Sequence, residues 1–245
     1  MPFLSNQYHL QTQNKDTDQG RPILDAKLWP KSWLSLEYKE YPRLPKIKLA
    51  NVGFDADLKT TIEERKSDRD FDRDKSLTFE EFSALLKYSC GETTNIMEGK
   101  PRRAHPSGGA RFPLEIYPVI FRPIGDIKAG LYHYNPKGHS LSVLEERVFT
   151  DEELDRLFVY DWTKKAQVGF VVTAVFERSQ RKYGDRGYRY ILIEAGHVGQ
   201  NVYLVSGALK LKCVGLGGTW DESLAKFLDI DGNLESVIYA LAVGK

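Results

Sequence analysis

Apolar residues recur at helical spacing in the segment that follows Thr78. They lie three and four positions apart, so they would share one face of a helix. Thr78 with Glu81 has the sequence of a capping box, and Gly91 supplies a stop signal. The same capping pattern occurs at Thr150 and Glu153. These patterns predict a helix that ends at Gly91 and a shorter helix that starts after Thr150.

Other apolar runs lack the helical period and are typical of buried strands. Residues 114–121 and 168–176 are rich in β-branched and aromatic side chains. Residues 131–134 and 141–144 flank the sequence Asn135-Pro136-Lys137-Gly138, which favours a turn. We therefore expect two buried strands and a hairpin. The polar stretch between Gly91 and Gly109 predicts a loop.

The longest periodic segment covers residues 188–211. It carries Gly196, Gly199 and Gly207, which lower helix propensity but permit close packing. We expect a long central helix, followed by a strand, a helix and a strand at residues 212–216, 221–228 and 236–243. The alternation predicts an α+β architecture, with a mixed sheet flanked by helices.

Residues 1–58 show no sustained period and are rich in Pro, Lys, Trp and Tyr. We expect an extended N-terminal arm whose aromatic side chains lie on this subunit or on a partner. Residues 59–245 would form a single elaborated domain.

Charge and hydropathy exclude several classes of protein. Thirty-five basic and thirty-four acidic residues give a net charge of +1, so the chain has no general field for nucleic acid or anionic membranes. No apolar run is long enough to span a bilayer, and residues 1–10 have neither the basic region nor the apolar region of a secretory signal. We expect a cytoplasmic protein. Cys90 and Cys213 are far apart and are expected to be free buried thiols.

The first segment with candidate chemistry is Arg65 to Phe71. Alternation in an extended chain would place Arg65, Ser67 and Arg69 on one side, where they could donate to a phosphate. The ordinary alternative is a solvated charged turn.

The acidic residues that follow Arg69 imitate the ligand spacing of a calcium-binding loop. Asp70, Asp72, Asp74 and Glu81 fit the pattern. However, Lys75 occupies the position where such a loop needs glycine. We therefore expect no metal site.

Two glycine-rich segments could bring backbone groups close to a flat or anionic ligand. One is Ser107-Gly108-Gly109, which precedes a predicted strand, and the other contains Gly217 and Gly218. Both segments could equally be ordinary turns.

The chain is unusually basic between positions 178 and 189, where four arginines surround Lys182 and Tyr183. Nearby positive charge would lower the pKa of both groups, so that either could act as a base. The alternative is a basic surface loop. On the long helix, His197 and Asn201 share a face, and we favour a structural role for His197.

The order of these segments resembles the SagB/ThcOx-type dehydrogenases, a branch of the nitroreductase-like superfamily. The motifs that carry the resemblance run from position 65 to the end of the chain. They include Pro106-Ser107-Gly108-Gly109-Ala110, Pro113-Leu114-Glu115-Ile116-Tyr117, Gly130-Leu131-Tyr132-His133-Tyr134, Lys182-Tyr183-Gly184 and Glu194-Ala195-Gly196-His197-Val198-Gly199-Gln200-Asn201.

The resemblance implies a nitroreductase-like fold and a homodimer with two FMN sites at the subunit interface. It assigns FMN binding to three segments and to one further residue. These are Arg65, Ser67 and Arg69; Ser107, Gly108 and Gly109; Gly217 and Gly218; and Lys245, which would reach the phosphate.

The resemblance also assigns catalysis to Lys182 and Tyr183. These would remove a proton from a thiazoline or oxazoline ring while a hydride passes to flavin N5. A precursor peptide or another biosynthetic enzyme would then be a partner. An NAD(P)H-dependent reductase of nitro, quinone or enone compounds remains an alternative. A flavin-binding or calcium-binding partner protein without catalytic activity is another.

Overall fold

A seven-stranded sheet forms the centre of the protein in the computed structural model, which describes residues 3–13, 26–97 and 100–245. Its strand order is β1-β6-β5-β4-β7-β9-β8. The strands are β1 (Lys46–Lys48), β4 (Leu114–Ile120), β5 (Gly130–Asn135), β6 (Ser140–Glu146), β7 (Val168–Val175), β8 (Lys212–Leu216) and β9 (Glu235–Gly244).

Every pairing in this sheet is antiparallel, so our expectation of a mixed sheet was wrong. The reason lies in the connections. The long helix separates β7 from β8, but β9 then inserts between them and runs antiparallel to both. The hydrophobic pattern within each segment does not predict which strands pair.

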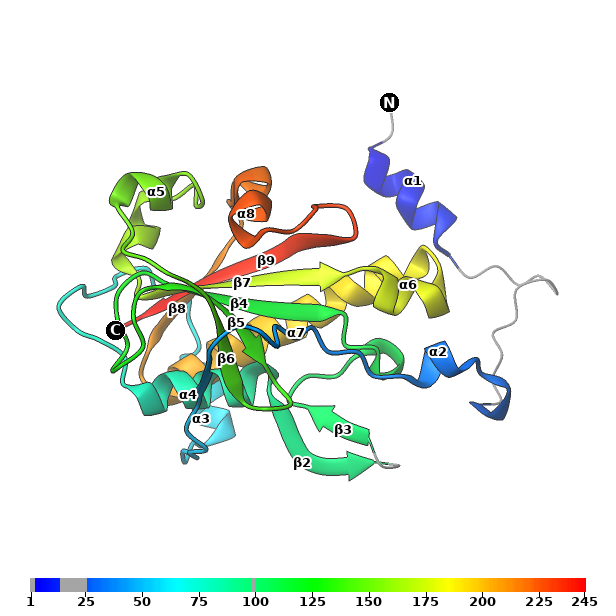
Figure 1. Ribbon diagram of the computed structural model, residues 1–245, viewed down its shortest axis with the longest axis horizontal. Coiled ribbons are helices and arrows are strands. Elements are labelled where there is room, and N and C mark those ends of the chain that lie inside the picture. The colour runs from blue at the N-terminus through cyan, green and yellow to red at the C-terminus, as the bar shows by residue number, and fades with distance from the viewer. Residues whose placement is uncertain (1–2, 14–25, 98–99) are drawn as a thin grey trace.

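Helices cover both faces of the sheet (Figure 1). One face carries α4 (Phe79–Cys90) and the long α7 (Arg186–Ala208), and the other carries α5 (Asp151–Asp155) and α8 (Asp221–Leu228). Two separate apolar cores result, one on each side of the sheet. The α+β architecture expected from the sequence is confirmed.

Both predicted capping boxes are present. Thr78 accepts a hydrogen bond from the backbone of Glu81, whose carboxylate accepts from the Thr78 backbone, and Thr150 and Glu153 do the same. Each pair satisfies two backbone groups that a helix start leaves free. The predicted long helix is also confirmed, and Gly199 brings α7 close to the Tyr239 ring.

The predicted loop after Gly91 was wrong, because most of it forms a two-stranded ribbon of β2 (Glu92–Met97) and β3 (Lys100–Arg103). A ribbon that stands apart from the main sheet needs no alternating apolar face, so it leaves no periodic signal.

The N-terminal segment lies across the same subunit. It contains α1 (Leu4–Gln11), the 3-10 turn η1 (Ala26–Leu28), α2 (Lys31–Leu34) and β1, which forms one edge of the sheet. Arg111 donates to the backbone carbonyls of Trp33 and Ser35 and fixes the segment beside η2 (Gly108–Ala110).

Two short helices lie at segments that the sequence marked as candidate sites. They are α3 (Leu58–Glu64), which ends just before Arg65, and α6 (Glu177–Tyr183), which contains Lys182. A 3-10 turn, η3 (Asp161–Lys165), precedes β7. Within the described residues, no helix is both long and apolar enough to cross a membrane.

Candidate functional site

Arg65 and Ser67 lie against the C-terminal half of α7. The guanidinium of Arg65 lies 5.5 Å from the centre of the Tyr203 ring, and the Ser67 hydroxyl is 3.0 Å from the Tyr203 hydroxyl. The same hydroxyl accepts a hydrogen bond of 2.6 Å from the backbone N–H of Gly215. Tyr203 therefore joins the basic segment to the strand that leads to Gly217.

A cavity of about 530 Å³ opens at this junction. Its walls contain four basic residues and two acidic residues. The lining residues are Glu64, Arg65, Lys66, Asp68, Tyr203, Gly207, Lys210, Leu211, Lys212 and Cys213. The excess of positive charge suits an anionic group such as a phosphate. Tyr203 and the two lysines of the 210–212 segment were not among the residues selected from the sequence.

Arg69 and the second glycine segment lie on the next part of the same surface. The Arg69 guanidinium is 5.5 Å from the centre of the Trp162 ring. Gly218 packs against Tyr160, whose ring stacks on Trp162. Gly217 is exposed, and a Cβ there would meet nothing within 4 Å. The Gly217 backbone is thus open to a ligand.

Lys245 is engaged elsewhere in this structure. Its ammonium forms an ion pair with Glu81, and its backbone carbonyl accepts a 2.7 Å hydrogen bond from Asp72. A role for Lys245 at a phosphate stays a prediction, and it would require the Glu81 pair to open.

Ser107, Gly108 and Gly109 lie beside Lys182 and Tyr183. Gly109 has a φ of 62°, in the left-handed region that favours glycine. A side chain at this position would collide with the Tyr183 hydroxyl and come within 3.2 Å of the Lys182 amine. The glycine therefore allows the loop and the Lys-Tyr pair to touch.

The N-terminal segment covers the Lys182 side chain. The Lys182 ammonium lies 3.4 Å from the centre of the Trp29 ring and 5.8 Å from that of Trp33. Trp33 is fixed by a 3.1 Å hydrogen bond from its indole to the carbonyl of Arg181. The structure thus places an aromatic enclosure over the amine, which the sequence did not reveal.

The pKa of Tyr183 is raised, so the expected lowering was wrong. Burial is the main cause, the neighbouring Tyr190 adds to it, and Arg111 acts in the opposite direction. The four nearby arginines have other partners. Arg178 pairs with Glu115, Arg181 with Glu177 and Glu37, Arg186 with Tyr190 and Thr12, and Arg189 with Thr12 and His9.

A buried ion pair anchors α6, where the sequence had suggested a basic surface loop. Arg178 donates to Glu115 at 2.5 Å, and both side chains are more than nine-tenths buried. Glu115 also lies 2.7 Å from His133. Burial would raise the pKa of Glu115, but His133 and Arg178 outweigh it, so that the pKa is lowered. The sequence feature that could have identified Glu115 is the run Leu114-Glu115-Ile116, where a single carboxylate interrupts an apolar strand.

The polar residues of α7 divide between its two faces. Asn201 donates to the backbone carbonyls of Ser89 and Ala104, which is a structural role. His197 is exposed. Glu194 is buried, and its carboxylate lies 3.3 Å from the imidazole of His105. Glu194 therefore brings α7 next to the loop that carries Ser107.

The acidic loop contains a cation of its own. The Lys75 ammonium lies 3.2 Å from the Asp72 carboxylate. No group of three or more metal-binding side chains occurs among the described residues. Cys90 and Cys213 are free and buried, as expected, and burial raises the pKa of each thiol to about 12.

The two sets of candidate residues lie at different points along α7. The Arg65 set consists of Arg65, Ser67 and Tyr203, and the Ser107 set consists of Ser107, Gly108, Gly109, Lys182, Tyr183 and Tyr190. Tyr203 and Tyr190 are thirteen positions apart on the helix, which corresponds to roughly 20 Å along its axis. Between them α7 exposes Leu192 and Ile193, which are 44% and 56% accessible. Two exposed apolar side chains of α7 thus lie between the two sets of candidate residues.

Comparison with known proteins decides the relationship of the chain. The model of the nitroreductase family matches residues 62–245. The chain belongs to the nitroreductase family. MJ1384 of Methanocaldococcus jannaschii, whose name refers to a nitroreductase, is 33% identical over 195 residues, which cover 78% of this chain and 89% of that protein.

Two further relatives of this nitroreductase-family protein are named as processing proteins. They are the trifolitoxin-processing protein TfxB of Rhizobium leguminosarum, 30% identical over 68% of this chain, and the microcin B17-processing protein McbC of Escherichia coli, 31% identical over 54%. The matches cover 47% of TfxB and 50% of McbC, about half the length of each.

Solved structures share the fold. A nitroreductase-family structure from Anabaena variabilis is 27% identical with a TM-score of 0.71, over 98% of this chain and 45% of that one. The Escherichia coli microcin synthetase McbBCD complex with truncated pro-MccB17 has a chain that is 22% identical with a TM-score of 0.62, over 98% and 86%. A Desulfovibrio desulfuricans nitroreductase-family structure in complex with FMN is 19% identical with a TM-score of 0.52, over 78% and 86%.

Proposed function

We propose that this nitroreductase-family protein is an FMN-dependent oxidoreductase. The observation that carries the proposal is the cationic cavity beside Tyr203. Arg69 and the open backbone of Gly217 follow, in sequence, the two segments that line this cavity. Arg65, Lys210 and Lys212 would hold the phosphate, and Ser67 and Arg69 would hold the ribityl chain and ring edge. The purified protein should then be yellow, with about one FMN per chain.

We further propose a homodimer in which each FMN site is built from both subunits. In one chain the Arg65 set and the Ser107 set are too far apart to contact a single flavin ring. Pairing across the exposed α7 face at Leu192 and Ile193 would bring the Arg65 set of one subunit to the Ser107 set of the other.

For the substrate, we propose a thiazoline or oxazoline ring within a peptide, oxidised to the aromatic heterocycle. TfxB and McbC are named for the processing of peptide products, and the McbBCD structure contains a bound precursor. A precursor peptide and a partner enzyme that forms the ring are therefore proposed as partners.

Lys182 and Tyr183 would have different roles in this reaction. The raised pKa keeps the Tyr183 phenol protonated near neutral pH, so it would donate a hydrogen bond that orients the ring. The amine of Lys182, once it has lost its proton, would take the ring proton. When FMN is bound, it supplies an acceptor for the hydride.

A synthetic thiazoline peptide tests the proposal. The FMN-loaded protein should remove two hydrogens from the peptide with oxygen present, as mass spectrometry would detect. Lys182→Ala and Tyr183→Phe should keep FMN and lower turnover by roughly a hundredfold to ten-thousandfold. Equal turnover by wild type and both variants would refute the catalytic roles.

A second candidate is an NAD(P)H-dependent reductase of nitro, quinone or enone compounds, which the name of MJ1384 favours. The same flavin cradle would serve it, whereas Lys182 and Tyr183 would be dispensable. NAD(P)H-driven reduction of a nitroaromatic compound that both variants retain, together with no oxidation of the thiazoline peptide, would support this candidate instead.

A further inference from the structure

A second cavity lies on the other side of the sheet from α7. It is about 550 Å³ in volume, within the usual range for small-molecule sites. Its apolar floor includes Phe121 and Leu154, which belong to the core under α5 and α8, whereas α7 packs in the other core. No residue lines both this cavity and the cationic cavity beside Tyr203, so the two cavities are distinct.

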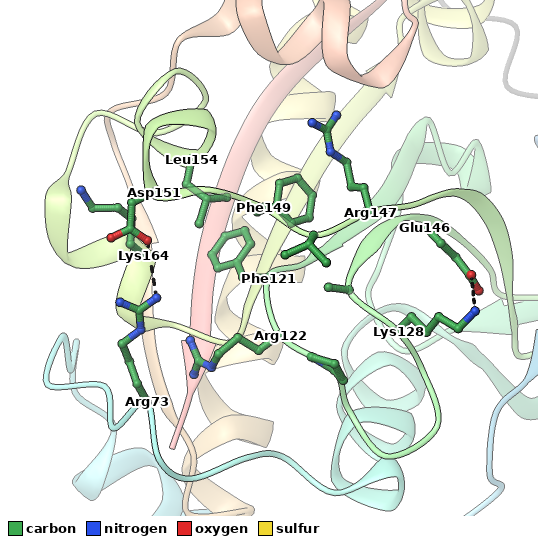
Figure 2. Close-up of a pocket in the computed structure, with 13 residues that line it drawn as sticks. Arg73, Phe121, Arg122, Lys128, Glu146, Arg147, Phe149, Asp151, Leu154 and Lys164 are labelled. Carbon is green, nitrogen blue, oxygen red and sulfur yellow. Dashed lines mark hydrogen bonds and ion pairs between the residues drawn. The ribbon is translucent and has the colours of Figure 1, made fainter.

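Basic side chains predominate around this cavity, as Figure 2 shows. Five basic residues line it against two acidic ones. The basic residues are Arg73, Arg122, Lys128, Arg147 and Lys164, and the acidic residues are Glu146 and Asp151. The walls therefore carry a net positive charge.

Both acidic residues are already neutralised by basic neighbours. Lys128 lies 2.7 Å from Glu146, and Arg73 lies 3.5 Å from Asp151. The other cations largely have partners too, because Lys164 pairs with Asp155 and Arg147 with Glu153. None of these ion pairs involves Arg122, the fifth basic residue of the cavity wall.

Arg122 is bound by backbone carbonyls rather than by a carboxylate. It donates to Ala166 at 2.8 Å and to Lys165 at 3.3 and 3.4 Å. Within the described part of the chain, Arg122 has no ion pair, and its Nε has no hydrogen-bond partner. Burial and the Arg73 charge lower the pKa of Arg122, and they outweigh the charges of Asp72 and Asp74, which act in the opposite direction.

The floor of the cavity is aromatic. Phe121 and Phe149 lie edge to face with ring centres 6.2 Å apart, and the Arg147 guanidinium lies 5.3 Å from the centre of Phe149. Such a surface favours an apolar or aromatic body over a compact, hydrated ion. A ligand must then combine a negative group with an apolar part.

We propose that this cavity binds a small organic anion with an aromatic or aliphatic body, whose carboxylate lies at Arg122 and Arg73. Phe121, Phe149 and Leu154 contact the body. The site is separate from the redox chemistry, and its existence does not depend on FMN binding.

Calorimetric titration of the purified protein with 3-phenylpropionate tests this site, with neutral 3-phenylpropanamide and inorganic phosphate as comparison ligands. The carboxylate should bind once per chain and roughly tenfold or more tightly than either comparison ligand, as one charge-assisted contact plus apolar burial would give. The flavin absorption spectrum should not change on binding.

Variants distinguish this cavity from other sites. Arg122→Gln should weaken binding of 3-phenylpropionate by roughly tenfold or more. Because Val148 lines the cavity and is 86% exposed, Val148→Glu should also weaken binding without affecting folding, whereas Val148→Gln should not. Lys59→Gln, at an exposed lysine outside the cavity, should bind as wild type does.

Three results would overturn the proposal. One is equal affinity for the carboxylate and the amide. Another is phosphate binding as tight as that of 3-phenylpropionate, which would indicate a simple anion site. The third is binding that alters the flavin spectrum and survives both Arg122→Gln and Val148→Glu, since it would then occur at the flavin.

Discussion

The arginines between positions 178 and 189 show how much a residue's chemistry depends on contacts that its neighbours in sequence do not supply. By count they would crowd Lys182 and Tyr183 with positive charge. In the structure Arg178 turns to Glu115, sixty-three positions away, and burial dominates at Tyr183. Residue type identified the segment, but the direction of the Tyr183 pKa shift depended on packing.

Arg65 and Arg69 are better defined by sequence, because alternation within a short segment depends only on local geometry. If they hold FMN, Arg65→Ala and Arg69→Ala should each weaken FMN binding by roughly ten- to a hundredfold, the equivalent of about 1.5–3 kcal/mol for one charged hydrogen bond. Quenching of FMN fluorescence on titration measures the dissociation constant.

Arg43→Ala is the matched control, because Arg43 is exposed and lies outside both cavities. It should bind FMN as wild type does. If Arg65→Ala and Arg69→Ala also bound FMN normally, the assignment of this segment to the cofactor would be wrong.

At the scale of elements, local signals predicted those structures whose stabilising contacts are local. The helices that begin after Thr78 and Thr150 are specified by capping boxes four residues long. In contrast, α6 is held by the buried pair of Arg178 with Glu115 on β4, and the order of the sheet arises from long-range pairing. No periodicity within the segments carries that information.

The buried pair gives a stability prediction. Glu115→Gln should reduce the free energy of unfolding by about 3–5 kcal/mol at neutral pH, because it leaves Arg178 buried without its counter-charge. Thermal or urea unfolding measures the loss. Glu177→Gln on the same helix removes an exposed ion pair with Arg181, which solvent screens, and should cost far less.

The pH dependence follows from the lowered pKa of Glu115. Its ionised form stabilises the fold above its ordinary pKa of 4.5, and this contribution is lost as the pH falls through the lower pKa of the folded state. The difference between wild type and Glu115→Gln should therefore shrink in acid. A cost no larger than that of Glu177→Gln, constant with pH, would contradict this account of α6.

At the scale of the whole molecule, the proposed flavin site needs a second subunit, because the Arg65 set and the Ser107 set lie roughly 20 Å apart along α7. The sequence resemblance implied a dimer, and the structure adds the exposed face of α7 that would form it. Ile193→Lys should convert the dimer to a monomer and reduce FMN retention together with it, since a buried unpaired charge is costly. Light scattering and the flavin spectrum report the two effects.

Leu58→Lys provides the control for this change. Leu58 is another exposed apolar residue, on α3, at 66% accessibility. This variant should remain dimeric. A wild-type monomer that holds FMN would contradict the shared site, and an Ile193→Lys dimer that behaves as wild type would place the interface elsewhere.

Mixing of subunits tests the shared site most directly. By this account Lys182→Ala lowers turnover, and Arg65→Ala leaves the sites largely empty when FMN is kept at a concentration that loads only intact sites. Under that condition neither homodimer should be active, but in a mixed dimer one site carries both changes and the other carries neither. Refolding the two variants together at equal concentration should restore roughly a quarter of wild-type thiazoline-peptide oxidation, since half of the dimers are mixed and each has one intact site. Activity that stays at the level of the separate variants would show that each site lies within one subunit.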